Sequence, residues 1–283
     1  MALDLTLVGK TTDAYAHSYG WKDVVLYALG VGAKRDELDL LYEGRGPKVL
    51  PSFAVVPMFQ PMFDVVRNSG GDLSMVVHGA QEVRIHKTLP AEAKVSTTAT
   101  LKAVYDLKRF ASLIIETTTK DEGDAVLAET TSSIIFRGEG GFGGTPPPVD
   151  ESAVKPPKDR PADFTVEEKT SEEQALLYRL SGDLNPLHAD PQFAAQVGFT
   201  QGPILHGLCT YGYMVRHVIK GACGGDPSRL TAFGSQFRKP VWPGDTLVTE
   251  GWHLEGGKIS LKVSVKERSE AVLGSAFAVV AGS

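Results

Sequence analysis

The chain has 283 residues, of which 42% are apolar and 22% are charged, and its net charge is −5. This composition is typical of a folded globular protein and excludes the disordered and fibrous classes. The negative charge argues against nucleic acid as a general partner, and two cysteines are too few for a disulfide framework or a four-cysteine zinc site. A chain of this length is expected to form two domains.

Neither end of the chain shows a recognisable targeting signal. The N-terminus, Met-Ala-Leu-Asp-Leu-Thr, lacks the basic flank and long apolar run of a signal peptide, and the C-terminus does not end in Ser-Lys-Leu. No stretch approaches the length of a membrane span. We therefore expect a cytoplasmic protein that does not contact a membrane.

The first half combines an apolar helical segment with a series of strands. Residues 53–66 predict a mostly buried helix, interrupted by Pro57 and Pro61 because proline lacks a backbone donor and clashes with the preceding turn. A charged, loop-like stretch at 34–48 precedes it. From residue 75 the sequence alternates and is rich in Thr, Val and Ile, which is typical of strands. The expected strands are 82–86, 94–101, 111–117 and 128–136.

A linker is expected between the two halves. Residues 138–162 contain a cluster of glycines, three consecutive prolines and a Lys-Pro-Pro-Lys segment, a composition that does not form a packed element. No Gly-Lys-Ser or Gly-Lys-Thr closes the glycine run, so we disfavour a phosphate-binding loop. The predicted organisation is an N-terminal domain at 1–137, the linker at 138–162 and a C-terminal domain at 163–283.

The pattern of the first half recurs after the linker. Residues 25–29 correspond to 176–180, Pro51 and Pro203 each begin an apolar helix, and His-Gly-Ala-Gln at 78 corresponds to Phe-Gly-Ser-Gln at 233. A repeat of about 150 residues indicates two homologous domains. Each half would place one buried helix against antiparallel strands, an α+β fold. The remaining strands of the second copy are expected at 252–254, 258–267 and 271–280.

The run Tyr-Arg-Leu-Ser-Gly-Asp-Leu-Asn-Pro-Leu-His ends at His188 and carries the strongest functional pattern. Gly182 permits a sharp exit from a helix, and the proline after Asn185 forces that residue out of the helical region. Such a loop can direct Asp183 and His188 to one spot, where an acid, a base and a polar group around one water support acid–base catalysis. Gly-Asp and Asn-Pro are also ordinary turn chemistry, but the imidazole has no turn-forming use.

This run resembles the signature of the hydratase 2 family, the (R)-specific enoyl-CoA hydratases of the MaoC-like group. The likeness continues through Ala-Asp-Pro at 189 to Gly-Pro-Ile-Leu-His-Gly-Leu-Cys-Thr-Tyr-Gly at 202–212. The resemblance implies a double hot-dog fold, in which two antiparallel sheets each wrap around a long central helix. It also implies reversible addition of water to trans-2-enoyl-CoA in fatty-acid metabolism, an acyl-CoA or acyl-ACP substrate, no cofactor and a homodimer.

The resemblance also implies roles for individual residues. Asp183 and His188 match the catalytic pair, and Asn185 matches the residue that helps to hold the water. Gly207 matches the backbone donor to the thioester oxygen, at the start of a helix whose first N–H groups have no partner inside the helix. His206 either contacts substrate or caps backbone groups, and we favour the cap.

The first half lacks this polar loop, since Gly32 aligns with Asp183 and charged residues follow it. Duplication followed by loss of one site explains the difference. In the family the degenerate half accommodates the acyl chain, which makes Phe53, Val55, Met58 and Phe59 candidate tunnel walls; plain core packing explains these residues equally well.

The phosphates of CoA require cations. Arg238 and Lys239, or Arg84 and Lys87 in the matching place of the first half, are the candidates, although exposed charges on strands are also commonly just solvated. The histidines show no HxH, HxxH or HExxH spacing, so no metal is expected.

In the reverse direction the chain would act as a 3-hydroxyacyl-CoA dehydratase. Three alternative functions stay open, and the first is a 3-hydroxyacyl-ACP dehydratase if the carrier is acyl carrier protein. A hot-dog acyl-CoA thioesterase would not need the Asn-Pro-Leu-His arm. A non-catalytic acyl-thioester binding subunit would not need Asp183, Asn185 and His188 together.

Overall fold

The computed structural model describes residues 3–144, 146–148 and 155–282. The expectations for Met1, Ala2, Ser283 and parts of the 138–162 linker therefore fall outside the described residues. The described residues of that linker form neither helix nor strand between β5 (Val126–Arg137) and β6 (Phe164–Lys169).

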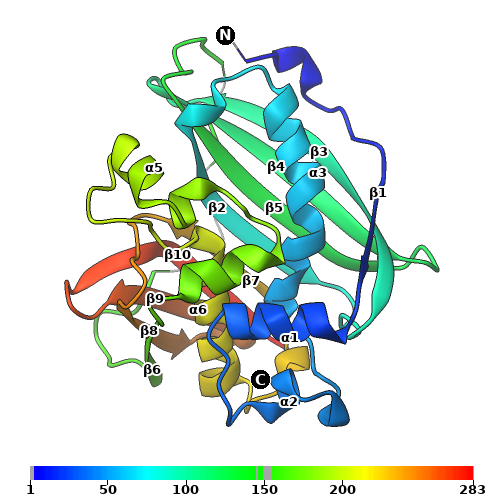
Figure 1. Cartoon of the computed structure of the whole chain (residues 1–283), viewed down its shortest axis with the longest axis vertical. Coiled ribbons are helices and arrows are strands. Elements are labelled where there is room, and N and C mark those ends of the chain that lie inside the picture. Colours follow the sequence, from blue (N-terminus) through cyan, green and yellow to red (C-terminus); the bar gives the residue numbers. More distant parts are fainter. Residues whose placement is uncertain (1–2, 145, 149–154, 283) are drawn as a thin grey trace.

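The described strands form one continuous antiparallel sheet with the order β1-β3-β4-β5-β2-β7-β10-β9-β8-β6. The two predicted sheets are thus joined edge to edge, with the first-half strands at one end and the second-half strands at the other (Figure 1). Each strand predicted from alternation overlaps an observed strand. Most observed strands are longer than predicted, because their backbone hydrogen bonds to neighbouring strands continue past the alternating residues. The remaining bounds are β1 (Tyr15–Tyr19), β2 (Val76–Ile85), β3 (Ala93–Asp106), β4 (Phe110–Asp121), β7 (Leu230–Phe237), β8 (Thr246–His253), β9 (Lys258–Val265) and β10 (Glu270–Val280).

The seam of the sheet lies between the two segments that the internal repeat aligns. In the β2–β7 pairing, Ala80 lies opposite Gln236 and Gln81 lies opposite Ser235. The corresponding segments of the two halves therefore pair with each other, as expected for an approximate twofold relation between homologous domains. The sheet crosses the domain boundary without a break.

The helices also follow the repeat. They are α1 (Trp21–Gly30), α2 (Leu38–Leu41), α3 (Val55–Asn68), α4 (Gln174–Tyr178), α5 (Pro191–Gln196) and α6 (Gly207–Ala222). Short 3₁₀ turns occur at Leu5–Leu7, Glu43–Arg45, Pro51–Ala54, Leu73–Met75, Arg179–Ser181, Pro186–His188, Pro227–Arg229 and Glu255–Gly257. The aligned tyrosines Tyr27 and Tyr178 pack against each other with ring centroids 6.0 Å apart. In the described part of the chain, every helix is too short or too polar to cross a bilayer.

The expected interruption of the first central helix is wrong, because α3 continues from Val55 to Asn68 with Pro61 inside it. Pro57 lies in the first turn, where a backbone N–H would have no helical partner. A proline in a helix interior costs about 3 kcal/mol, and the burial of α3 against β3, β4 and β5 offsets that cost (Figure 1). The second central helix, α6, is buried at every position from Leu208 to Ile219.

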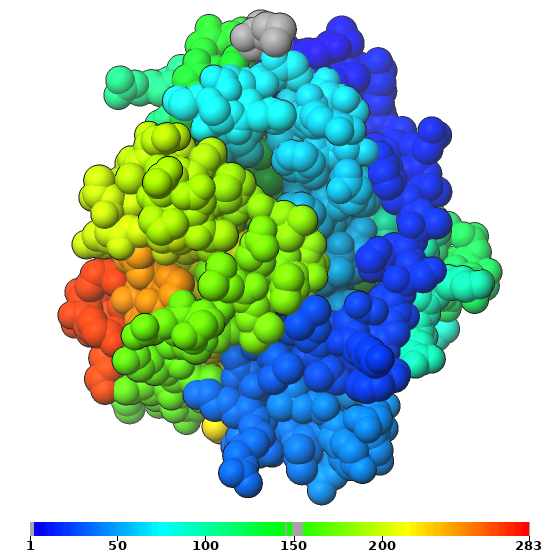
Figure 2. Space-filling view, in the orientation of Figure 1, coloured from blue at the N-terminus to red at the C-terminus, as the bar shows by residue number. Residues whose placement is uncertain are grey.

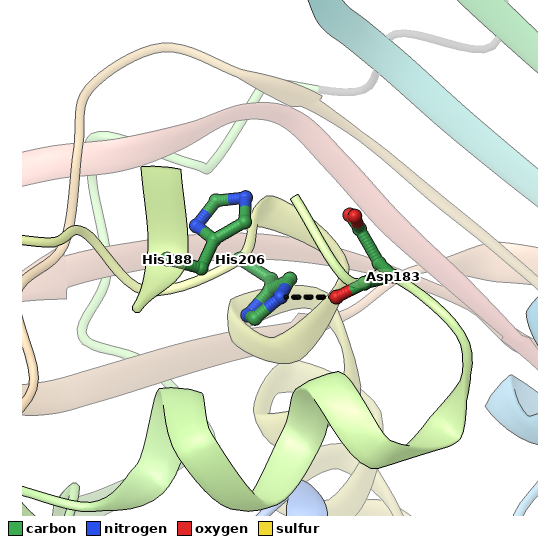
Figure 3. Close-up of side chains that lie close together, drawn as sticks. All are labelled: Asp183, His188 and His206. Carbon is green, nitrogen blue, oxygen red and sulfur yellow. Dashed lines mark hydrogen bonds between the residues drawn. The ribbon is translucent and has the colours of Figure 1, made fainter. Parts of the chain in front are cut away.

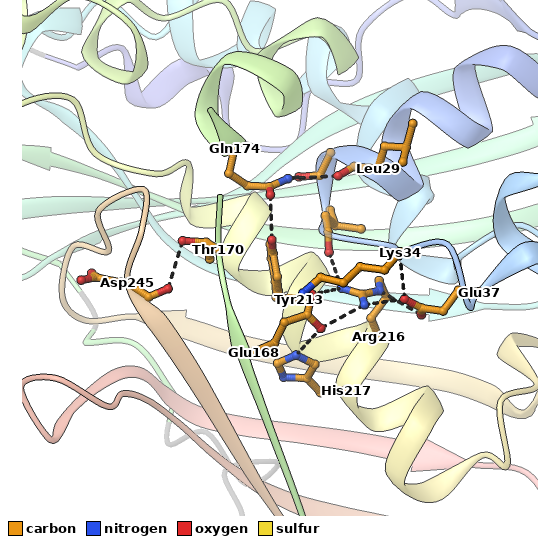
Figure 4. A network of polar contacts seen from close by, with 12 residues as sticks. Leu29, Lys34, Glu37, Glu168, Thr170, Gln174, Tyr213, Arg216, His217 and Asp245 are labelled. Atoms are coloured by element: carbon orange, nitrogen blue, oxygen red, sulfur yellow. Dashed lines mark hydrogen bonds and ion pairs between the residues drawn. The ribbon is translucent and has the colours of Figure 1, made fainter. Parts of the chain in front are cut away.

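A buried ion cluster joins the two halves. Arg216 of α6 is 3% exposed and contacts Glu37 at 2.6 Å and Glu168 of β6 at 3.0 Å. Its guanidinium also donates to the carbonyl of Val31 at 2.8 Å, and Lys34 contacts Glu168 at 3.3 Å (Figure 4). The charged stretch of the first half, at the place of the polar loop of the second half, thus contacts the second half through Lys34 and Glu37.

Candidate active site

The loop that follows α4 takes its shape from its own sequence. Gly182 has φ 132°, a conformation that favours glycine. Asp183 Oδ1 accepts the backbone N–H of Asn185 at 3.2 Å, and Asn185 Oδ1 accepts that of Leu187 at 3.0 Å. These two turns are the ordinary turn chemistry considered above, and they bring His188 back towards Asp183.

The imidazole of His188 is held in one orientation. The residue is 8% exposed, and its Nδ1 donates to the carbonyl of Ile204 at 2.8 Å. That bond leaves Nε2 as the nitrogen available for proton transfer. Burial lowers the pKa of His188 below its usual 6.5, against the opposing effect of the Asp183 carboxylate. The ring is therefore neutral at pH 7 and can accept a proton.

His206 lies against both members of the pair (Figure 3). It is 1% exposed, its Nε2 donates to the backbone carbonyl of Asp183 at 3.1 Å, and its ring stacks on that of His188. Burial, together with the neighbouring His188, lowers the pKa of His206 to about 2, so the ring stays neutral. His206 does not line the cavity of about 820 Å³ that this loop borders. His206 thus hydrogen-bonds a backbone group, which is the role that we favoured over contact with substrate.

One possible metal site arises that sequence spacing did not indicate. Nitrogen and oxygen atoms of Asp183, His188 and His206 lie within 4.8 Å of one another. The three side chains come from two separated segments, so no short motif marks them. His188 Nδ1 and His206 Nε2 each donate to a backbone carbonyl, so His188 Nε2, His206 Nδ1 and the Asp183 carboxylate are the atoms left for proton transfer or for ligation.

The loop at residues 182–188 borders a cavity of about 820 Å³, called the main cavity here, which is lined by residues of both halves. The loop and the start of α6 supply Asp183, Asn185, His188 and Gly207. The first half supplies a mostly apolar wall. Figure 2 shows a hollow between the yellow-green residues of the second half and the cyan residues of α3. The apolar lining from the first half is Phe59, Met62, Phe63, Val66, Val76, Val77, Ile134 and Ile135.

Of the four predicted tunnel walls, only Phe59 lines the main cavity. Phe53, Val55 and Met58 belong to the hydrophobic core, and Met58 is 0% exposed. The reason is which face of α3 borders the main cavity. The apolar lining residues of this helix are spaced i, i+3, i+4 and i+7 from Phe59, which is one helical face. That spacing is visible in the sequence and would have identified the three missed residues, Met62, Phe63 and Val66.

Gly207, predicted to supply a backbone donor, lies at the start of a helix. It is the first residue of α6 and lines the main cavity beside the catalytic loop. The N–H groups of a first helical turn have no partner within the helix. A Cβ atom on Gly207 would lie 3.1 Å from the ring of Phe237, so glycine also allows this close packing.

The two pairs of basic residues predicted to bind the CoA phosphates differ in position. Arg238 and Lys239 are exposed and line the main cavity; Arg238 donates to Gln236, and Lys239 lies 3.7 Å from Glu270. Arg84 and Lys87 do not line it. They are exposed and lie 3.8 Å from Glu82 and 2.9 Å from Asp121, respectively. Arg84 and Lys87 are therefore exposed surface charges, the alternative to CoA binding considered above.

Known proteins share both halves of this chain. The MFE-2 hydratase 2 N-terminal domain matches residues 17–138, and the MaoC like domain matches residues 153–274. Peroxisomal enoyl-CoA hydratase 2 of Arabidopsis thaliana is 37% identical over 95% of this chain and 93% of its own length. The chain belongs to the hydratase 2 family.

Solved structures related to this hydratase 2 family member agree with its fold. A MaoC-like dehydratase from Phytophthora capsici superposes with a TM-score of 0.88 at 30% identity, covering 99% of this chain and 98% of that one. A Mycobacterium tuberculosis protein with a double hotdog fold is 16% identical and superposes with a TM-score of 0.61 over 96% of each chain. The predicted double hot-dog fold is confirmed.

Proposed function

We propose that this protein catalyses the reversible addition of water to trans-2-enoyl-CoA, giving (R)-3-hydroxyacyl-CoA in fatty-acid metabolism. It is a hydro-lyase. The observation that carries the proposal is the meeting of Asp183 and His188 at the main cavity, next to the first residue of α6. An acid–base pair beside a backbone donor is what hydration of an unsaturated thioester requires.

Each residue has a chemical role in this mechanism. Water attacks C3 of the enoyl group, a proton is delivered to C2, and negative charge develops on the thioester oxygen. Asp183 and His188 exchange the two protons as a coupled pair, and the Asn185 amide orients the water. The N–H of Gly207 stabilises the developing oxyanion, because an unpaired donor at a helix start is already oriented towards that charge. The reaction needs no metal or cofactor.

The two halves divide the substrate between them. The acyl chain lies along the α3 face formed by Phe59, Met62, Phe63 and Val66, so the first half serves as the acyl-binding domain. Arg238 and Lys239, which also line the main cavity, contact the CoA phosphates. Apolar lining and exposed cations suit these two parts of an acyl-CoA.

Two further properties complete the proposal. The protein is a homodimer, because hot-dog units commonly associate through their sheets; light scattering tests this. It acts in the cytoplasm, whereas the Arabidopsis relative is peroxisomal. Cell fractionation distinguishes the two compartments.

The decisive assay supplies crotonyl-CoA and a longer 2-enoyl-CoA to the purified protein. Loss of enoyl absorbance reports hydration, and a chirality-specific dehydrogenase identifies the product. Formation of (R)-3-hydroxyacyl-CoA supports the proposal. Free CoA without hydration would instead indicate the thioesterase. Activity confined to acyl carrier protein substrates would indicate the ACP dehydratase, and no reaction with any of them would favour the binding subunit.

A further inference from the structure

A second cavity, here called the rear cavity, borders the catalytic loop. Its volume is about 460 Å³, and His188 is the residue that its lining shares with the main cavity. Ala189 follows His188 in the same wall. The catalytic imidazole residue therefore forms part of the partition between two cavities.

The wall of the rear cavity is polar and rigidly held. Arg268 donates two hydrogen bonds to the Asp245 carboxylate, each of 2.9 Å, and a third to the carbonyl of Pro240 at 3.1 Å. Its guanidinium lies 5.1 Å from the ring centroid of Trp242, whose backbone N–H donates to Asp245 at 2.8 Å. A wall tied together at so many points is formed before substrate arrives.

The charges of this wall do not suit the phosphates of CoA. Arg268 is already neutralised by Asp245, and Glu172 adds a second carboxylate. An anion entering the cavity would face net negative charge. Water has no such penalty, because these groups offer it both donors and acceptors.

The hydration reaction creates a need for a second route. In the proposed reaction the enoyl thioester occupies the main cavity, whose lining includes Asp183 and His188. Water must nevertheless reach the pair in hydration and leave it in dehydration. We propose that the rear cavity is the path by which water and protons exchange with His188 while the thioester stays bound. This inference rests on the proposed hydratase function.

The test follows oxygen exchange in the dehydration direction. The enzyme is given (3R)-hydroxybutyryl-CoA in oxygen-18 water, with excess enoyl-CoA reductase and NADPH to remove any enoyl-CoA that is released. Oxygen-18 in the remaining hydroxybutyryl-CoA then reports water exchange within the bound complex, and butyryl-CoA reports dehydration followed by release. We expect the wild-type protein to incorporate label under these conditions.

The variant Ala189→Leu places a larger side chain in the rear cavity. It should lower the ratio of label to butyryl-CoA by about tenfold, which is about 1.4 kcal/mol on the exchange step. Ala195→Leu, on the exposed face of α5 and outside both linings, is the matched control and should keep the wild-type ratio. Circular dichroism verifies that both variants fold.

Two results would overturn the rear route: a wild-type ratio in folded Ala189→Leu, or no label in the wild-type protein while butyryl-CoA accumulates. Absence of butyryl-CoA and of label would have a different meaning, since it would refute the dehydration chemistry itself and the rear route with it.

Discussion

The rings of His188 and His206 stack with their centroids 3.7 Å apart and their planes inclined by 26°. Because His206 also donates to the backbone of Asp183, one buried imidazole contacts both members of the proposed catalytic pair. Burial keeps that imidazole neutral. It can therefore fix the geometry of the pair without adding a charge that would compete with the proton transfers.

Removing either member of the pair should abolish most of the activity. Asp183→Asn and His188→Ala should each lower kcat by about 10²-fold or more, because each removes a proton-transfer group. Steady-state hydration of crotonyl-CoA measures this, with circular dichroism to verify folding. Asp190→Asn is the control, since Asp190 caps α5 through its side chain and asparagine caps equally well. Near-normal kcat in either site variant would refute the assignment.

His206 should act as a positioning residue. His206→Phe should lower kcat by about 10-fold to 100-fold. The Asp183 carbonyl then loses its hydrogen bond to residue 206, and Asp183 and His188 are no longer held in the geometry that proton transfer requires. KM should change little. His206→Gln retains an amide donor and should recover most of kcat. Equal losses in the two variants, each in proportion to a lowered Tm, would mean that His206 only stabilises the fold.

The pH dependence should follow His188. Its pKa lies below 6.5, so the neutral ring that accepts a proton persists at pH 7, and kcat/KM should fall only as the pH drops through that lowered pKa. A decline of kcat/KM that begins above pH 6.5 would contradict this.

The stability of the fold must be measured over the same pH range. Burial lowers the pKa values of His78, to about 4, and of His206 and His217, so unfolding takes up protons and stability also falls below pH 6.5.

The ion cluster between the halves should dominate the electrostatic stability. Glu168→Gln leaves Arg216 without one of its buried partners and should lower the free energy of unfolding by about 3 kcal/mol, measured by urea denaturation at pH 7. Lys34→Met removes a contact from a lysine side chain that is 56% exposed and should change it by less than about 1 kcal/mol.

The same cluster predicts an acid dependence. Burial alone would raise the pKa of Glu168, but His217 and Arg216 outweigh it and hold the pKa at about 2. Because this value is depressed, the contribution is present above about pH 4.5 and is lost as the pH falls towards 2. The difference between wild type and Glu168→Gln should shrink over that range. A constant difference would show that the carboxylate charge is not what stabilises the interface.

Chain-length preference should respond to the lining face of α3. Phe59→Trp adds volume inside the main cavity and should lower the ratio of kcat/KM for a long 2-enoyl-CoA to that for crotonyl-CoA by about 10-fold. Met58→Leu, one residue earlier but in the core, should leave the ratio unchanged. A change of ratio in both variants would indicate a general loosening of α3 rather than a tunnel wall.

Sequence alone was sufficient for the features that local chemistry controls. Gly182, the turns at Asp183 and Asn185 and the following proline shape the catalytic loop within a few residues, so its form was predictable from the run itself. The internal repeat and the alternating strands were equally visible, because periodicity of two residues reports one buried face of a sheet.

Tertiary structure decided everything that depends on packing between distant segments. It joined β2 to β7, chose which face of α3 lines the main cavity, and kept α3 continuous through Pro61. It also placed His206 against Asp183 and paired Arg84 and Lys87 with strand carboxylates instead of directing them to the site. Apart from the contact between Arg84 and Glu82 on one strand, these features share a physical reason. Each depends on packing between segments far apart in the chain, and the balance of burial, pairing and desolvation that selects it exists only once the core has formed.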